Sequence, residues 1–176
     1  MINKTKTRSL LLLLFLVAGF ASVLLLGLAS RQGGTEQSSI VKSFPVFSAP
    51  ELLNPQKVLT PDVFSQPYQL VNVWASWCGV CKREHSFLLD LQKQGVTIIG
   101  LNYRDKNSAA VQYLQQAGSP YQSIIYDPKG ALALDLGVVG TPETYLVDRE
   151  GQIIKKFSGE LTLSAWQSSF SRYFIE

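Results

Sequence analysis

The chain has 176 residues, of which 46% are hydrophobic and 16% are charged, and its formal net charge is +3. This length suits one domain of ordinary size rather than two. Four of the 16 basic residues flank an apolar run near the N-terminus, which leaves 12 basic against 13 acidic residues elsewhere; the four are Lys4, Lys6, Arg8 and Arg31. Because a nucleic-acid-binding domain needs clustered basic residues of its own, the composition argues against a nucleic-acid partner.

Residues 10–29 form an apolar stretch without a charged side chain. A secretory signal has an apolar core of about 7–15 residues, whereas a membrane-spanning helix needs about 20. We therefore expect a transmembrane anchor, although Gly27 and Ala29 would also suit a signal peptidase. The excess of positive charge before the run predicts that residues 1–9 are cytoplasmic and that the rest of the chain lies across the membrane. Residues 30–43 are polar and rich in Gly and Ser, which predicts a flexible linker.

The remaining chain, residues 44–176, alternates between strand and helix patterns. Strands are predicted at 68–75, 96–101, 124–126, 144–147 and 152–157, and helices at 79–94, from Asn107 to near Gly118, and from Thr162 onward. Strands that alternate with helices favour an α/β domain, and a hairpin between the last two strands makes its sheet mixed.

Two cysteines, Cys78 and Cys81, lie between a predicted strand and a predicted helix. A structural disulfide across so short a loop would contribute only about 2 kcal/mol, and no further cysteines exist to complete a zinc site. This position of a dithiol therefore favours redox chemistry. The unpaired N–H groups and positive dipole at the helix N-terminus would stabilise the first sulfur as a thiolate. We expect Cys78 to be the attacking nucleophile and Cys81 the resolving thiol.

Glu84 occupies an unusual position on the predicted helix. On a helical wheel it lies in the middle of the apolar arc, between Leu88 and Leu91, while the other charged residues lie opposite. Burial raises the pKa of a carboxyl group toward neutrality. Because Glu84 follows Cys81 by about one turn, we predict that it exchanges a proton with that thiol. His85 lies at the border of the arc and is predicted to be a packing residue.

Three residues before the dithiol are also distinctive. Asn72 is polar in an apolar strand and is expected to make a hydrogen bond. Trp74 is expected in the core, whereas Trp77 adjoins the first cysteine and is a candidate to shield its thiol.

Several segments together resemble one family. They are residues 73–82 (VWASWCGVCK), 100–105 (GLNYRD) and 134–144 (LDLGVVGTPET). The first resembles the active-site segment of the thioredoxin superfamily, and the set resembles the DsbE/CcmG family within it. Members of that family are membrane-anchored thiol:disulfide interchange proteins of cytochrome c biogenesis.

The resemblance implies a thioredoxin-like α/β fold over residues 44–176, with a central mixed sheet flanked by helices and preceded by one N-terminal transmembrane helix. It also implies that Pro142 is a cis-proline beside the dithiol. The residues expected to support the active site or contact substrate are Trp77, Gly79, Val80, Thr141, Pro142 and Glu143. Thioredoxin has a buried Asp at the position of Asn72, so in this chain the task of that acid would pass to Glu84.

The same resemblance implies a location and partners. The chain would be a single-pass protein of the bacterial inner membrane, with its C-terminal domain in the periplasm. It would reduce a disulfide in apocytochrome c, or in a cytochrome c maturation protein, so that haem can attach. Electrons would come from a membrane thiol-reductant donor, because the periplasm is oxidising. No dissociable cofactor and no metal are implied.

Two alternatives stay open. A general periplasmic thiol reductant or oxidant would share the active-site residues. A copper-binding chaperone could use Cys78, Cys81 and His85, although a helical His85 one turn beyond Cys81 would point away from Cys78.

Overall fold

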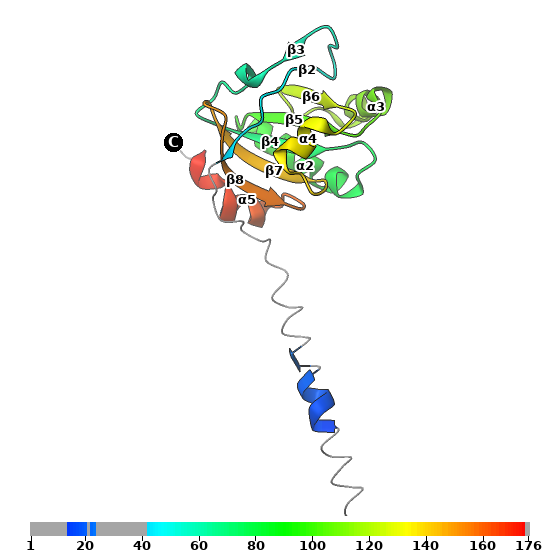
Figure 1. Ribbon diagram of the computed structural model, residues 1–176, viewed down its shortest axis with the longest axis vertical. Coiled ribbons are helices and arrows are strands. Elements are labelled where there is room, and N and C mark those ends of the chain that lie inside the picture. Colours follow the sequence, from blue (N-terminus) through cyan, green and yellow to red (C-terminus); the bar gives the residue numbers. More distant parts are fainter. Residues whose placement is uncertain (1–13, 21, 24–41, 175–176) are drawn as a thin grey trace, which may run out of the picture. The chain divides into compact units, whose positions relative to one another are not determined.

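The computed structural model describes residues 14–20, 22–23 and 42–174 (Figure 1). The chain divides into two compact units, Met1–Gly34 and Thr35–Glu176. In the first unit the described residues are helical and exposed. The second unit contains every named strand and helix discussed below.

No helix among the described residues is both long enough and apolar enough to cross a membrane. The predicted cytoplasmic segment, residues 1–9, lies outside the described residues. So do most of the predicted anchor, residues 10–29, and all but two residues of the predicted linker, residues 30–43. These three segments remain predictions.

The second unit is built on a six-stranded sheet in the order β1-β8-β7-β4-β5-β6. Its strands are β1 (Lys42–Ser43), β4 (Tyr68–Trp74), β5 (Ile98–Tyr103), β6 (Ser123–Asp127), β7 (Glu143–Asp148) and β8 (Gln152–Ser158). Strands β4, β5 and β6 are parallel, whereas β7 runs antiparallel to β4 and to β8, and β8 antiparallel to β1. A separate hairpin pairs β2 (Ala49–Pro50) with β3 (Val58–Leu59). The prediction of an α/β domain with a mixed sheet is therefore confirmed.

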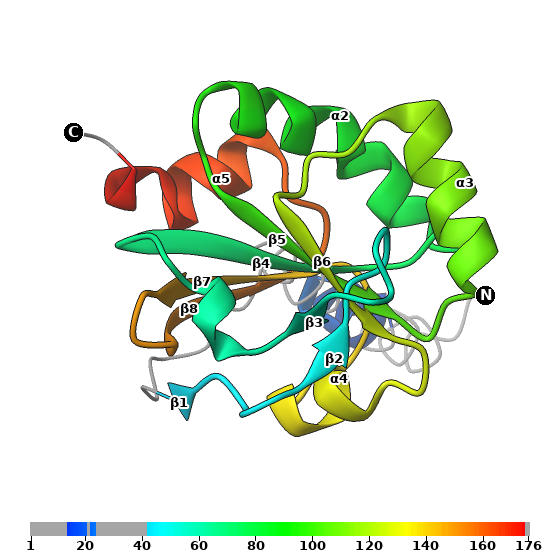
Figure 2. The same cartoon turned by 90° about the horizontal axis from the view of Figure 1, so that it is seen from above.

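Helices cover both faces of this sheet (Figure 2). One face carries α2 (Gly79–Lys93), α3 (Asn107–Ala117) and α5 (Leu163–Ser169), and the other carries α4 (Ala131–Leu136). Short 3-10 helices, η2 (Pro61–Val63) and η3 (Ser171–Tyr173), complete the unit. In β4, Leu70 packs with the cluster of α2 and α5 while Val71 and Val73 pack with that of α4. Both faces of β4 are covered, so the strand is buried from Gln69 to Trp74 and is mostly apolar, with Gln69 and Asn72 as its buried polar residues.

One strand boundary differs from the prediction because apolar residues belong to a turn instead of to the strand. The predicted strand over 96–101 starts later, at Ile98, because the N–H of Val96 donates to the carbonyl of Leu91 in the turn that ends α2. Helix α4 was not predicted; at six residues it is too short to display a helical period. Helix α3 begins at Asn107, as predicted; its N-cap is Lys106, and the side-chain amide of Asn107 donates to the carbonyl of Leu52.

Candidate active site

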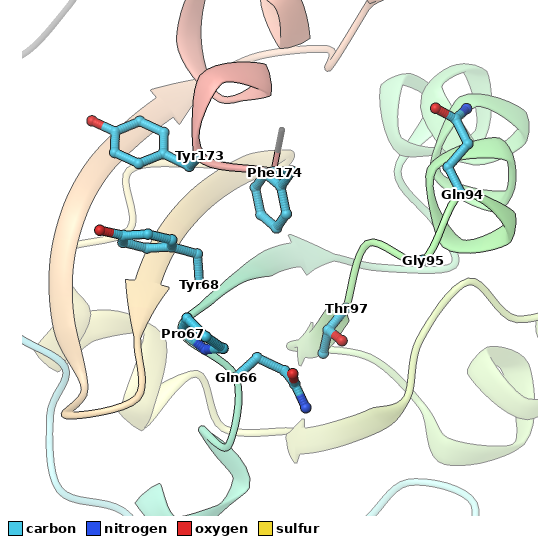
Figure 3. Close-up of a pocket in the computed structure, with 8 residues that line it drawn as sticks. All are labelled: Gln66, Pro67, Tyr68, Gln94, Gly95, Thr97, Tyr173 and Phe174. Carbon is cyan, nitrogen blue, oxygen red and sulfur yellow. The ribbon is translucent and has the colours of Figure 1, made fainter. Parts of the chain in front are cut away.

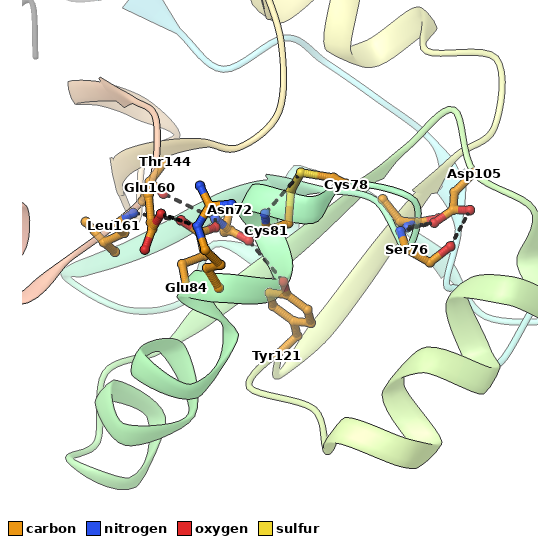
Figure 4. Close-up of a disulfide and its surroundings, with 12 residues drawn as sticks. Asn72, Ser76, Cys78, Cys81, Glu84, Asp105, Tyr121, Thr144, Glu160 and Leu161 are labelled. Atoms are coloured by element: carbon orange, nitrogen blue, oxygen red, sulfur yellow. Dashed lines mark hydrogen bonds and ion pairs between the residues drawn. A yellow bond between two sulfur atoms is a disulfide. The ribbon is translucent and has the colours of Figure 1, made fainter.

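The dithiol lies at the point where β4 ends and α2 begins (Figure 4). The N–H of Cys78 donates to the carbonyl of Ala75 over 3.1 Å, which closes a four-residue turn. Cys78 is then the N-cap residue of α2, and Cys81 lies in the first turn of the helix. The two cysteines form a disulfide. The sequence prediction that they occupy a strand-to-helix junction is therefore confirmed.

The two sulfur atoms have different electrostatic surroundings. The Sγ of Cys78 accepts a hydrogen bond from the backbone N–H of Cys81 over 3.1 Å, as an N-cap side chain does. Each cysteine is only 5% exposed, so exposure does not distinguish them. The N-cap hydrogen bond does, because it favours negative charge on Cys78. The assignment of Cys78 as nucleophile and Cys81 as resolving thiol stays a prediction.

Glu84 is 1% exposed and faces the sheet from α2. Its Oε1 accepts from Asn72 Nδ2 over 2.9 Å, and its Oε2 accepts from the backbone N–H of Leu161 over 2.7 Å. Desolvation by burial raises the pKa of Glu84 to about 7, against the smaller opposing effect of these hydrogen bonds. The predicted burial and raised pKa are confirmed. Its part in proton transfer with Cys81 stays a prediction.

Asn72 connects Glu84 to Thr144 in β7 and to Tyr121 in the segment before β6 (Figure 4). Its Nδ2 also donates to Thr144 Oγ1 over 3.2 Å, and its Oδ1 accepts from Tyr121 Oη over 3.0 Å. Burial raises the pKa of Tyr121 well above its ordinary value, and the negative charge of Glu84 adds a smaller effect in the same direction. Among the described residues, the groups that donate hydrogen bonds to Glu84 are an amide and a backbone N–H, and neither is a cation. The carboxylate is therefore hydrogen-bonded but has no bonded positive charge to keep it ionised.

The loop before β7 carries the predicted proline. The peptide bond between Thr141 and Pro142 is cis. Because Glu143 lies opposite Val73 in the sheet, this loop borders the end of β4 from which the dithiol turn leaves. Pro142 is buried, Thr141 is half-buried, and Val139 in the same loop is 92% exposed.

Glu143, predicted to support the site, holds this loop in place. It is 2% exposed, and its Oε2 lies 3.0 Å from Lys156 Nζ. Its Oε1 accepts from the backbone N–H of Val139 over 3.1 Å, while Oε2 also accepts from Tyr145 Oη over 2.7 Å. Lys156 in turn donates to the carbonyl of Gly137 over 3.1 Å. The sequence did not predict that Lys156 and Tyr145 are the partners of Glu143.

The remaining predicted residues lie around the disulfide in different environments. Val80 packs in the cluster that contains both cysteines, and Gly79 is exposed. The side chain of Trp77 is 58% exposed, and its Nε1 donates to the carbonyl of Arg104 over 3.1 Å. Trp74 is 1% exposed, as expected of a core residue.

His85 has the packing role that was predicted for it. It is 6% exposed, and its Nε2 lies 3.1 Å from the carbonyl of Gly118. Its ring meets that of Tyr113 edge-on at 5.0 Å between centroids, and burial lowers the pKa of His85. Within the described ranges no three His, Cys, Asp or Glu side chains are grouped so as to hold a metal ion.

An open pocket of about 560 Å³ lies at the opposite end of β4 (Figure 3). Its lining residues are Gln66, Pro67, Tyr68, Gln94, Gly95, Thr97, Tyr173 and Phe174. Since β4 has seven residues, at about 3.3 Å each, this pocket is well separated from the dithiol and takes no part in its chemistry.

Comparison with known proteins agrees with this geometry. Residues 41–169 match the Redoxin family model. Thiol:disulfide interchange protein DsbE of Vibrio cholerae is 39% identical over 158 residues, which cover 89% of this chain and 86% of that protein. The Escherichia coli protein of the same name is 38% identical, covering 92% and 91%.

Solved structures show the same fold. A secreted thiol-disulfide isomerase from Corynebacterium glutamicum has a TM-score of 0.63 at 23% identity, covering 78% of this chain and 96% of that one. A DsbF homologue from Corynebacterium diphtheriae has a TM-score of 0.66 at 22% identity, covering 81% and 95%. The thioredoxin-like fold predicted for the domain is thereby confirmed.

Proposed function

We propose a reductive role in cytochrome c maturation for this chain, which belongs to the redoxin family and, within it, to the DsbE thiol:disulfide interchange proteins. It is a thiol:disulfide oxidoreductase. Its substrate, in this proposal, is a disulfide of apocytochrome c or of a cytochrome c maturation protein. The chain acts from the bacterial inner membrane, anchored by residues 10–29, with its thioredoxin-like domain in the periplasm.

The observation that carries the thiol–disulfide exchange chemistry is the asymmetry of the dithiol, in which the N-cap hydrogen bond falls on Cys78. With both cysteines reduced, the Cys78 thiolate at the N-cap attacks one sulfur of the substrate disulfide. The second substrate sulfur leaves as a thiolate, and Cys78 is held in a mixed disulfide. The Cys81 thiol then gives its proton to the Glu84 carboxylate and attacks Cys78 Sγ. This releases the first substrate sulfur as a second thiolate and leaves the Cys78–Cys81 disulfide, and the proton on Glu84 passes to one of the two substrate thiolates.

The surface around the dithiol supports a polypeptide as substrate rather than a small thiol. Trp77 is 58% exposed and Val139 is 92% exposed, on the two loops that border the end of β4. A contiguous apolar patch beside a reactive centre is typical of a site that binds another protein, and in this proposal Trp77 and Val139 belong to such a patch. An unfolded polypeptide such as an apocytochrome offers complementary apolar segments. The reducing equivalents come from a membrane thiol-reductant donor, which restores the dithiol after each cycle.

The experiment that tests the proposal is a substrate trap in the native host. Cys81→Ser in the full chain leaves Cys78 able to attack but unable to release its product. We expect apocytochrome c or a maturation protein to accumulate in disulfide-linked complexes with this variant. Cys78→Ser is the matched control and should trap nothing. Trapping of many unrelated periplasmic proteins, with cytochromes absent, would replace the proposal with a general thiol reductant or oxidant.

A further inference from the structure

We propose that the β5–α3 loop clamps the turn that presents Cys78, and that Asp105 in this loop is a positioning residue for thiol–disulfide exchange. The proposal concerns the oxidoreductase chemistry of the dithiol and does not depend on the identity of the substrate. The loop runs from Arg104 to Lys106, between β5 and α3.

The clamped element is the turn Ala75–Cys78, closed by the hydrogen bond from the N–H of Cys78 to the carbonyl of Ala75. Its two central residues, Ser76 and Trp77, both bond to the β5–α3 loop. The N–H of Ser76 donates to Asp105 Oδ2 over 2.5 Å, and its hydroxyl donates to Oδ1 over 2.8 Å (Figure 4). The indole Nε1 of Trp77 donates to the carbonyl of Arg104 over 3.1 Å. Three hydrogen bonds thus fix both central positions of the turn.

Asp105 is itself held rigidly. It is 7% exposed, and its carboxylate also accepts from Asn102 Nδ2 over 3.1 Å and from the backbone N–H of Lys106 over 2.8 Å. Counting the two bonds from Ser76, four donors surround its two oxygens. Four donors hold the buried carboxylate in one orientation. The hydrogen bonds that it accepts from Ser76 therefore have a fixed direction.

The Arg104 carbonyl is directed at Trp77 by an uncommon backbone conformation. Arg104 has a φ of 45°, in the left-handed region that L-residues seldom adopt. Its N–H donates to the carbonyl of Asp127 over 3.0 Å, which fixes the peptide on the other side. Gly130 leaves the space for the side chain, since a Cβ there would lie 2.6 Å from Arg104 Nε. Strained residues of this kind concentrate at functional sites, where the surrounding structure supports them.

The clamp matters most when the dithiol is reduced. The bond from the N–H of Cys81 to Cys78 Sγ stabilises the thiolate only while Cys78 keeps its N-cap position. In the oxidised protein the disulfide helps to keep that position. In the reduced protein this covalent link is gone, and the hydrogen bonds to Ser76 and Trp77 remain. Loosening the turn should therefore raise the pKa of Cys78.

The opposite sign is expected if Asp105 acts only through its charge. A nearby negative charge disfavours a thiolate, so removing that charge alone would lower the pKa of Cys78. Other charged side chains on the neighbouring elements, among them Arg104, Lys106, Lys82, Arg83, Glu84 and Glu143, are left unchanged by the substitution. The direction of the shift in Asp105→Ala thus separates positioning from a simple charge effect.

The experiment measures the pH profile of Cys78 alkylation by iodoacetamide in the reduced full chain. It is done in a Cys81→Ala background, which leaves one thiol and keeps the backbone N–H that bonds to Cys78. We expect Asp105→Ala to raise the pKa of Cys78 by about one unit, which is about tenfold in thiolate at lower pH. Asp90→Ala, which removes an exposed carboxylate paired with Lys93, is the matched control and should leave the profile unchanged.

A second pair of variants keeps the test decisive if Asp105→Ala does not fold. Ser76→Ala removes one hydroxyl bond, and Trp77→Phe removes one indole bond, with the rest of the clamp intact. Each should raise the pKa of Cys78 by a smaller amount, and the double variant by more than either. An unchanged or lowered pKa in Asp105→Ala, or in the double variant, would overturn the proposal.

Discussion

Two buried glutamates on the elements next to the dithiol, Glu84 on the helix that contains Cys81 and Glu143 on the strand paired with β4, differ in the groups that compensate their charge. Glu84, on α2, is 1% exposed, and in the described part of the chain it bonds to an amide side chain and a backbone N–H. Glu143, at the start of β7, is 2% exposed and lies 3.0 Å from the ammonium group of Lys156. Burial without a bonded cation raises the pKa of Glu84 to about 7. The comparison indicates that Glu84 is placed to change its protonation state, whereas Glu143 is placed to hold a loop.

The Lys156→Met variant would test the holding role of Glu143 and should have the largest effect. It leaves a buried carboxylate without its cation, which typically costs about 3–5 kcal/mol of folding free energy. Lys156 is 21% exposed, so solvent screening places the expected loss near the lower figure. Chemical denaturation of the full chain measures it. The control Lys93→Met, which breaks the exposed pair with Asp90, should change the free energy of unfolding by less than about 0.5 kcal/mol. Equal losses in the two variants would show that Lys156 stabilises the fold no more than an exposed ion pair does.

The raised pKa of Glu84 predicts a smaller, pH-dependent effect on stability. The pKa is about 7 in the folded protein against 4.5 in the unfolded reference, so the folded state binds more protons between these values. Stability from this group is therefore fully present below about pH 4.5 and is lost as pH rises toward 7. At about 1.4 kcal/mol per pKa unit, the loss approaches about 3 kcal/mol.

Denaturation of the wild type and of Glu84→Gln, at pH 5 and at pH 8, isolates this contribution. The difference between the two proteins cancels the opposite effect of His85, whose pKa is lowered by burial. We expect Glu84→Gln to be the more stable protein at pH 8 but not at pH 5. Gln fits the site if its oxygen accepts from Leu161 and the Asn72 amide turns over, since Tyr121 Oη can either donate or accept. A stability difference that does not change with pH would show that Glu84 is ionised in both states.

The sequence predicted the helix face that contains Glu84 but could not predict the partner of Glu143. The first depends on a helical period within one element, and local spacing determines it. The second depends on a β-bulge between β7 and β8 at Leu146/Val147. Val147 pairs with Ile153, and extending that register without the bulge would place Lys155 opposite Tyr145; the bulge brings Lys156 there instead.

The clamp on the dithiol turn was unpredictable for a related reason. Ser76 and Asp105 are 29 residues apart and meet because β4 and β5 are parallel neighbours whose ends lie at one edge of the sheet. The sequence predicted both strands but not the lengths and turns of the loops that follow them. The fold class, the dithiol and Glu84 follow from local patterns, whereas Lys156 and the Asp105–Ser76 contact depend on tertiary register.

The central claim is that Glu84 accepts the proton of Cys81, and the rate of mixed-disulfide resolution tests it most directly. A mixed disulfide between Cys78 and a chromophoric thiol can be formed, and its release by Cys81 followed by stopped-flow absorbance from pH 5 to 9. In the wild type we expect an inflection near pH 7, matching the pKa of Glu84. In Glu84→Gln we expect resolution about 100-fold slower near neutral pH, without that inflection. Identical rates and pH profiles in the two proteins would contradict the account.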